Sequence, residues 1–284
     1  MPDSTPSTEE IFIPETAPRI FARVWRPAAA RAVIAICHGV NSHSGQYLWA
    51  AERMARLGFA VYALDLRGRG RSDGERFFVE RIDDYVADLS ALIAFAKARE
   101  PGLPVYLLGH SAGGVVACSY ALDHQVELAG LICESFAFQV PAPAFALGLI
   151  KGISHIAPRV PVLRLRNEDF SRDPAVVKSL NADPLIAGER QPAATVAALV
   201  RADERLRRDF PLVRLPVLIL HGTADKATVP AGSRFFHETA GAADKTLKLY
   251  DGHFHDLLAD RGRDEVLADI LAWIEARLPR LKAA

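Results

Sequence analysis

The expected fold follows from one stretch, Val105-Tyr106-Leu107-Leu108-Gly109-His110-Ser111-Ala112-Gly113-Gly114, in which an apolar run leads into the pattern Gly-x-Ser-x-Gly. The run predicts a buried strand over Val105–Leu108, and Gly114–Leu122 has the pattern of the helix that should follow. Small residues also occur at strand–helix junctions for packing alone. A serine in the sharp turn between the two elements is held exposed with strained backbone, because the flanking glycines have no Cβ to block the bend. Ser111 is therefore the candidate nucleophile.

Strand-like and helix-like segments alternate on both sides of this stretch. The runs Ala32–Ile36, Phe59–Leu64 and Leu128–Cys133 are apolar throughout, and Trp49–Leu57 and Ile82–Arg99 have helical patterns. Strands that are apolar on both faces and alternate with helices are typical of a parallel sheet covered by helices. The sequence therefore predicts the α/β class, with a mostly parallel central sheet.

Further segments extend this sheet at both ends of the chain. The short runs Ile11–Ile13 and Ile20–Trp25 are separated by prolines and predict an edge hairpin. After residue 210 the alternation resumes with segments that predict strand, helix, strand and helix: Pro216–Gly222, Ala231–Ala240, Thr246–Tyr250 and Arg263–Leu278.

Between residues 136 and 210 the alternation is lost. This segment is rich in Pro and Ala and contains short helical patterns such as Pro192–Leu206. A segment of about 70 residues is too long for an ordinary connecting loop. We interpret residues 136–210 as a helical lid, inserted into a core domain formed by residues 1–135 and 211–284.

Composition excludes several classes of protein. The 284 residues are 50% hydrophobic, enough to bury a large core, and 34 basic residues balance 34 acidic ones without a basic block, so no nucleic-acid partner is expected. Cys37, Cys118 and Cys133 lie in apolar patterns without metal-ligand spacing, so we expect buried thiols, with no disulfide and no metal site. The polar first six residues argue against a signal peptide and favour a cytoplasmic protein. The most apolar segment, 136–150, contains two prolines and is too short to span a bilayer.

The loops after the later strands contain an acid and a base. Asp225 follows the strand 216–222, and His255 follows the last strand. A serine hydroxyl needs an imidazole to remove its proton, and the imidazole needs a carboxylate to fix its tautomer. The order Ser, Asp, His is the order in which α/β-hydrolases place their triad. His253 is the alternative base and Glu134 the alternative acid, whereas Asp251 and Asp256 are expected to cap the following helix.

Backbone amides of two loops are candidates for an oxyanion hole. Such a hole combines the N–H after the nucleophile, here that of Ala112, with one from an earlier strand-end loop, for which Val40 after His38-Gly39 is the candidate. We expect His38 and His221 to be packed, structural histidines.

Nearly the whole chain resembles the α/β-hydrolases of the monoacylglycerol lipase and lysophospholipase branch, which includes serine aminopeptidase-type enzymes. The resemblance rests on five motifs: His38-Gly39-Val40-Asn41-Ser42-His43-Ser44-Gly45-Gln46-Tyr47, Leu64-Asp65-Leu66-Arg67-Gly68-Arg69-Gly70-Arg71-Ser72-Asp73-Gly74, Gly109-His110-Ser111-Ala112-Gly113-Gly114, His221-Gly222-Thr223-Ala224-Asp225 and Tyr250-Asp251-Gly252-His253-Phe254-His255. It implies Ser111, Asp225 and His255 as the triad, and Val40 with Ala112 as the oxyanion hole.

The chain departs from this branch near the mouth of the expected site. Asn41-Ser42 replaces Gly-Glu, Ala112 replaces a frequent Met, and Arg69 replaces the His between the glycines of the arginine loop. Asp65, Arg67 and Ser72 are expected to fix that loop structurally. Its Gly-x-Gly lacks both the dinucleotide spacing and the Walker lysine, so no nucleotide cofactor is expected.

The sequence thus predicts a cofactor-free serine carboxylester hydrolase that forms an acyl-enzyme. The expected substrates are apolar acyl esters: monoacylglycerol, lysophospholipid, broad carboxylesterase substrates or aliphatic polyesters. Phe136, Phe138, Phe145 and Leu149 are expected to line an acyl channel or to contact a membrane peripherally, or else to pack the lid on the sheet. The triad also fits a peptidase, thioesterase or C–C hydrolase, and the fold fits a non-catalytic binding protein. The serine excludes haloalkane dehalogenases and epoxide hydrolases, which need a carboxylate there.

Overall fold

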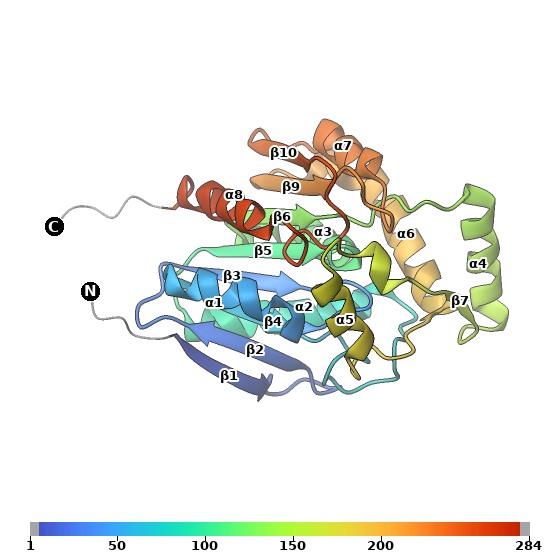
Figure 1. Ribbon diagram of the computed structural model, residues 1–284, viewed down its shortest axis with the longest axis horizontal. Helices are drawn as coiled ribbons and strands as arrows, with labels where there is room; N and C mark the ends of the chain where they lie inside the picture. Colours follow the sequence, from blue (N-terminus) through green and yellow to red (C-terminus); the bar gives the residue numbers. More distant parts are fainter. Residues whose placement is uncertain (1–5, 279–284) are drawn as a thin grey trace.

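An eight-stranded sheet organises residues 6–278, the residues that the computed structural model describes (Figure 1). Its strand order is β1-β2-β4-β3-β5-β6-β9-β10. The strands from β4 to β10 in this order run parallel, whereas β1 and β2 form the predicted antiparallel edge hairpin. The strand bounds are β1 (Ser7–Phe12), β2 (Phe21–Arg26), β3 (Ala32–Cys37), β4 (Phe59–Leu64), β5 (Val105–His110), β6 (Gly130–Glu134), β9 (Val217–Gly222) and β10 (Lys245–Tyr250). The first five residues, whose polarity argued against a signal peptide, lie outside the described part of the chain.

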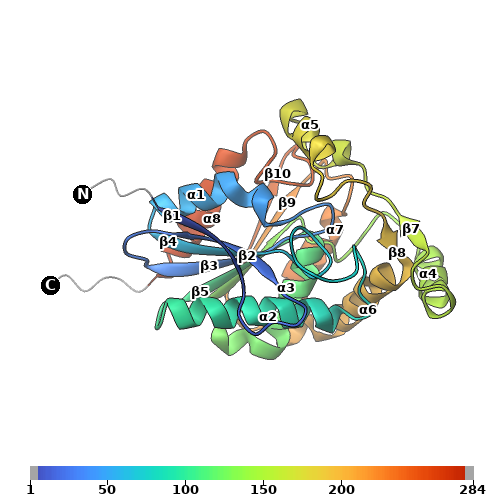
Figure 2. The ribbon, with the colours of Figure 1, turned by 90° about the horizontal axis from the view of Figure 1, so that it is seen from below.

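Helices cover both faces of the sheet (Figure 2). Buried residues of α1 and α8 pack on one face, and those of α2, α3 and α7 pack on the other. The predicted helix Ile82–Arg99 matches α2 residue for residue. The bounds are α1 (Leu48–Arg56), α2 (Ile82–Arg99), α3 (Ala112–His124), α7 (Pro230–Thr239) and α8 (Arg263–Glu275), with short 3₁₀ helices η1 (Ser44–Tyr47), η2 (Gln125–Glu127), η3 (Asn167–Asp169) and η4 (Phe210–Leu212).

The strand register brings the functional loops to one edge of the sheet. Every residue of β3, β4, β5, β6 and β9 is buried, as expected for strands covered on both faces. His110 pairs with Glu134 at the ends of β5 and β6, and Gly222 pairs with Tyr250 at the ends of β9 and β10. The loops after these strands therefore meet at the carboxyl edge, where ligands bind in open parallel sheets.

The inserted segment has two parts. The helices and strands between β6 and β9 are α4 (Ala144–Ile156), β7 (Pro161–Leu163), α5 (Pro174–Ala182), β8 (Gln191–Pro192) and α6 (Ala193–Asp209). Ala202 and Leu206 of α6 belong to the same hydrophobic cluster as α2 and α3, so α6 is part of the layer that covers the sheet. In contrast, α4 packs on α6 at the periphery of the molecule, and β7 pairs with β8 outside the main sheet (Figure 1).

The cysteines are buried thiols, as predicted. Cys37, Cys118 and Cys133 are free and inaccessible, and burial raises the pKa of Cys37 and of Cys118. Within residues 6–278, no helix combines the length and apolar character needed to cross a membrane.

Candidate active site

Ser111 occupies a strained turn between β5 and α3. Its backbone has φ 54° and ψ −122°, a conformation that costs energy for a residue with a side chain. The Ser111 N–H donates to the Glu134 carbonyl at 2.9 Å, which fixes the turn to β6. A Cβ on Gly113 would lie 2.2 Å from the Cys37 carbonyl oxygen, so only glycine allows this close approach. The strained serine turn predicted from the sequence is confirmed.

The three residues predicted as a triad lie within hydrogen-bonding distance of one another. Ser111 Oγ is 2.8 Å from His255 Nε2, and His255 Nδ1 is 2.8 Å from Asp225 Oδ2. The side chains of His255 and Asp225 are both inaccessible to solvent. With Nδ1–H donating to the carboxylate, Nε2 is free to accept the serine proton.

Several donors hold the Asp225 carboxylate in its ionised form. Oδ1 accepts the backbone N–H groups of Ala227 and Thr228 at 2.8 and 3.0 Å, and Oδ2 accepts the Thr228 hydroxyl at 2.7 Å. His221 Nε2 lies 3.1 Å from the same oxygen, which gives this buried, structural histidine a direct contact with the acid. Burial favours the neutral acid, but the charge of His255 and the hydrogen bonds from His221 and His255 outweigh it and lower the pKa of Asp225.

The alternative base and acid have other contacts. The His253 ring stacks on Tyr250, with centroids 5.4 Å apart. Glu134 Oε1 accepts the backbone N–H of Leu258 at 3.0 Å. The expectation that Asp251 and Asp256 cap the following helix is wrong, because α8 begins only after Gly262. Asp251 instead accepts the Thr223 hydroxyl at 3.1 Å.

The loop after β3 lies directly against the nucleophile turn. A Cβ on Gly39 would lie 2.8 Å from Ser111 Cβ and 3.3 Å from the Ala112 amide nitrogen, so the backbone leading into Val40 is in contact with both. His38 fixes this loop: its Nδ1–H donates to the Gly39 carbonyl at 2.7 Å, and Nε2 accepts the Leu66 N–H at 3.0 Å. Burial lowers the pKa of His38 to about 4, so the ring is neutral. The packed histidine predicted at this position is confirmed.

The arginine loop braces the same region, as predicted. Asp65 Oδ1 accepts the Ser44 N–H at 2.7 Å, Arg67 Nη2 donates to Asp88 at 2.7 Å, and the Ser72 hydroxyl accepts the Phe21 N–H at 2.8 Å. The contact to Ser44 joins the arginine loop to the loop that carries Val40.

Asn41 and Arg69, two of the departures from the family pattern, contact the same residue of the insertion. Glu189 forms an ion pair with the buried Arg69, and its Oε1 accepts the Asn41 N–H at 2.9 Å. Arg69 Nη2 also donates to Gln191 Oε1 at 2.9 Å, and His43 contacts Asp183 at 2.8 Å. A buried ion pair contributes little net stability, but it holds its partners in one arrangement. In this chain it fixes the second half of the insertion to the loop that carries Val40.

The four residues predicted to bind the acyl chain lie in two separate places. Phe136 and Phe138 are buried and pack with phenylalanines of η4 and α7, including Phe210. Phe145 and Leu149, on α4, are 78% and 63% exposed. The structure thus places one pair in the core and the other on the outer surface of the insertion.

Phe170, a residue that sequence reasoning missed, lies against the base. Its ring meets that of His255 edge-on, with centroids 5.0 Å apart and an interplanar angle of 85°. No periodicity or motif marks this position, because its neighbours Asp169 and Ser171 are polar. The insertion therefore places one aromatic side chain, that of Phe170, against His255.

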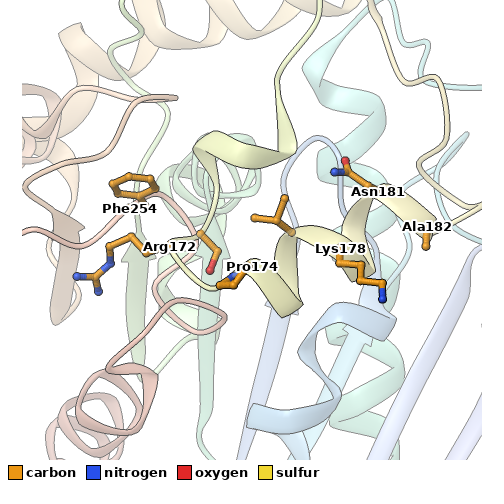
Figure 3. A pocket seen from close by; sticks show the side chains of 8 residues that line it. Arg172, Pro174, Lys178, Asn181, Ala182 and Phe254 are labelled. Atoms are coloured by element: carbon orange, nitrogen blue, oxygen red, sulfur yellow. The ribbon is translucent and has the colours of Figure 1, made fainter.

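A groove is lined by residues of α5, by Ser171 and Arg172 before it, and by Phe254. It has a volume of about 790 Å³ and extends from Phe254 to Lys178 and Ala182 of α5 (Figure 3). Phe254 precedes His255, and Ser171, which also lines the groove, follows Phe170. The groove therefore reaches residues that are adjacent in the chain to His255 and Phe170, while Ser111 itself is 3% exposed.

Known proteins share both the sequence pattern and the fold. The family model of serine aminopeptidase S33 matches residues 28–262. A monoacylglycerol lipase of Mycolicibacterium smegmatis is 31% identical over 97% of this chain and 99% of its own length, and human monoglyceride lipase is 31% identical over 91% and 87%. The crystal structure of a monoacylglycerol lipase from Paleococcus ferrophilus, 29% identical, superimposes with a TM-score of 0.82 over 91% of this chain and 99% of that one. The chain therefore belongs to the serine aminopeptidase S33 family and has the α/β-hydrolase fold.

Proposed function

We propose that this chain is a serine carboxylester hydrolase that acts on esters of apolar acyl chains, with monoacylglycerol-type esters as its main substrate class. The observation that carries the proposal is the continuous hydrogen-bonded series from Ser111 Oγ through His255 to Asp225, at the carboxyl edge of the sheet. Membership in a family of lipases, esterases and peptidases supports hydrolysis as the reaction type.

The geometry supports a two-step mechanism. Ser111 Oγ attacks the ester carbonyl carbon while His255 Nε2 takes its proton. The tetrahedral intermediate then collapses, and His255 gives that proton to the departing alcohol, which leaves an acyl-serine. Water attacks the acyl-serine with His255 again as base, and protonation of Ser111 Oγ releases the acid.

Two backbone amides are proposed to stabilise the intermediate. The N–H groups of Val40 and Ala112 belong to loops in direct contact at Gly39 and Ser111. Donors fixed near the developing oxyanion contribute about 2.7–4 kcal/mol each, because they need no reorganisation when the charge forms. The contacts of His38 and Asp65 hold the Val40 loop in place for this role.

The exposed apolar residues of the insertion support the proposal that the substrate has an apolar acyl group. Besides Phe145 and Leu149, Ile156 of α4 is 89% exposed, so an apolar strip lies on the outer surface of the insertion. Such a surface is suited to contact with a lipid interface that supplies the substrate. Because Phe170 covers His255, we expect this part of the insertion to move when an ester enters. An acyl-channel role for Phe136 and Phe138 stays a prediction.

A series of p-nitrophenyl esters from acetate to palmitate tests the substrate class. We expect kcat/KM to rise by at least 10-fold from acetate to the medium-chain esters, since each buried methylene contributes about 0.8 kcal/mol. Monoacylglycerols of the preferred chain length should also be hydrolysed. Fastest turnover of the acetate ester would contradict an apolar acyl site.

The family model favours one second candidate. Its description as a serine aminopeptidase fits the same triad acting on an amide bond. Turnover of an aminoacyl naphthylamide, with none of any ester in the series, would replace esterase by peptidase as the function.

A further inference from the structure

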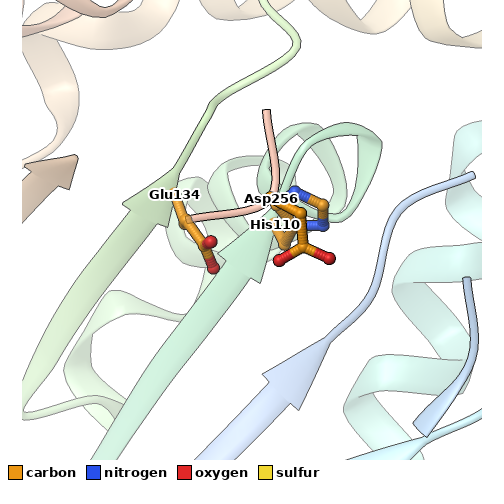
Figure 4. A group of neighbouring side chains, drawn as sticks. All are labelled: His110, Glu134 and Asp256. Atoms are coloured by element: carbon orange, nitrogen blue, oxygen red, sulfur yellow. The ribbon is translucent and has the colours of Figure 1, made fainter. Parts of the chain in front are cut away.

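Three buried titratable side chains lie together beneath the base. Glu134 ends β6, His110 ends β5, and Asp256 directly follows His255 (Figure 4). One carboxyl oxygen of Glu134, one of Asp256 and one ring nitrogen of His110 lie within 4.8 Å of one another. All three residues are at least nine-tenths buried, and the mechanism above uses none of them.

Glu134 connects the nucleophile turn with the base turn. Its backbone carbonyl accepts the Ser111 N–H at 2.9 Å, and its side-chain Oε1 accepts the Leu258 N–H at 3.0 Å. Leu258 belongs to the turn that presents His255. Among the described residues, Oε2 of Glu134 and both ring nitrogens of His110 have no hydrogen-bond partner. The His110 ring lies 4.9 Å from the His255 ring, centroid to centroid.

The surroundings do not favour two negative charges in this cluster. The titratable groups that face the two carboxyls are His110 from β5, Tyr47 from η1, Tyr250 from β10, and His255 and Asp260 from the loop after β10. These neighbours supply no fixed positive charge, and a buried, unpaired carboxylate is costly. Burial, and then the charge of Asp256, raise the pKa of Glu134. Burial raises the pKa of Asp256 to about 6, and burial together with His255 lowers the pKa of His110.

We propose that Glu134 and Asp256 form a carboxylic acid–carboxylate pair in which Glu134 holds the proton, and that Glu134 is thereby a positioning residue for His255. The neutral acid keeps Oε1 as the acceptor for Leu258 and supplies an O–H donor toward Asp256. The neutral imidazole of His110 has one donor and one acceptor nitrogen to complete the cluster. The base turn is thus fixed to β6 without a second buried charge beside His255. The positioning role rests on the proposed function of His255 as base.

Glu134→Gln tests the pair because glutamine mimics the protonated acid. Its carbonyl still accepts from Leu258 and its NH₂ still donates toward Asp256. In the wild type, the folded state holds the Glu134 proton at pH values where the unfolded chain has released it, so the wild type loses stability as pH rises above about 4.3. Urea unfolding of both proteins from pH 5 to pH 8 should therefore show the folded-to-unfolded ratio of the wild type falling relative to that of Glu134→Gln, by up to about tenfold per pH unit. Glu80→Gln, an exposed site, is the control for loss of one charge and should show no such trend.

The kinetic half of the test compares two variants at pH 7. Glu134→Gln should keep kcat within about threefold of the wild type, whereas Glu134→Ala, which loses the acceptor for Leu258, should lower kcat by at least tenfold with little change in KM. A pH-independent stability difference, or stoichiometric metal in the wild type that is lost in Glu134→Ala, would overturn the carboxylic acid–carboxylate pair. A pH-dependent difference with kcat unchanged in Glu134→Ala would overturn the positioning role but leave the pair. Failure of the proposed function would show separately, as absence of fluorophosphonate labelling at Ser111 in the wild type.

Discussion

Replacement of Ser111 by alanine is expected to lower kcat for ester hydrolysis by on the order of 10⁴- to 10⁶-fold, because among residues 6–278 no other oxygen is held against His255 Nε2. The methyl group removes the attacking atom but leaves the amides of Val40 and Ala112 in place. A residual rate above that in water is therefore expected, through orientation and oxyanion stabilisation alone. KM should change by less than a few fold, since Oγ contributes little to ground-state binding. Steady-state kinetics on the preferred p-nitrophenyl ester measures both quantities.

Ser119→Ala is the matched control for this experiment. Ser119 lies on the same helix as the nucleophile turn, is also buried, and donates to the Val115 carbonyl at 2.8 Å. Its replacement should leave kcat within about threefold, although it removes an equal number of atoms. Wild-type turnover by Ser111→Ala would show that another group performs the attack.

Asp225→Asn is expected to lower kcat by about 10⁴-fold while the geometry persists. The amide keeps an oxygen for the Ala227 and Thr228 N–H groups, so the turn after β9 should remain intact. It cannot, however, stabilise the imidazolium that forms on His255, and it favours the tautomer whose Nε2 carries the proton and cannot accept from Ser111. Steady-state kinetics together with near-UV circular dichroism separate this effect from misfolding.

The control for the acid is Asp251→Asn. Asp251 lies on the adjacent loop and contacts the Thr223 hydroxyl at the surface, so its replacement should leave kcat within about twofold. Equal losses in the two variants would show that charge at this edge of the sheet, rather than contact with His255, determines the rate.

The sequence predicted the core because its signals are local and repeated. The strands around Ile34, Val61 and Leu107 are continuous apolar runs, and parallel strands covered on both faces leave few other arrangements. Loops that follow parallel strands meet at one edge of the sheet, so the positions of Ser111, Asp225 and His255 after their strands predicted that they lie at the same edge without any knowledge of distances.

The insertion could not be predicted to the same degree. Its contacts join distant positions, as in Arg69 with Glu189, and pairing across so many residues has no local signature. Composition also gave the same expectation for Phe136 and Phe145, yet one is in the aromatic core and the other faces solvent. Whether a phenylalanine is buried depends on what the fold places beside it, here Phe210 and Phe236 for Phe136.

The carboxyl cluster beneath the base illustrates the same limit. The sequence marked Glu134 as a possible triad acid because it ends the strand after the nucleophile helix. In the structure the carboxylate that contacts His255 is that of Asp225, whereas the Glu134 side chain accepts the Leu258 N–H. Position at the end of a strand therefore marked both Glu134 and Asp225 as candidates, and only the three-dimensional contacts distinguished between them.

The nucleophile can be identified directly by mass spectrometry of the native protein after reaction with a fluorophosphonate. We expect one phosphonyl group per chain, located on the peptide that contains Ser111, with no adduct in Ser111→Ala and much slower labelling in Asp225→Asn. An adduct on another residue, or no reaction of the folded wild-type protein, would contradict a serine hydrolase built on Ser111, His255 and Asp225.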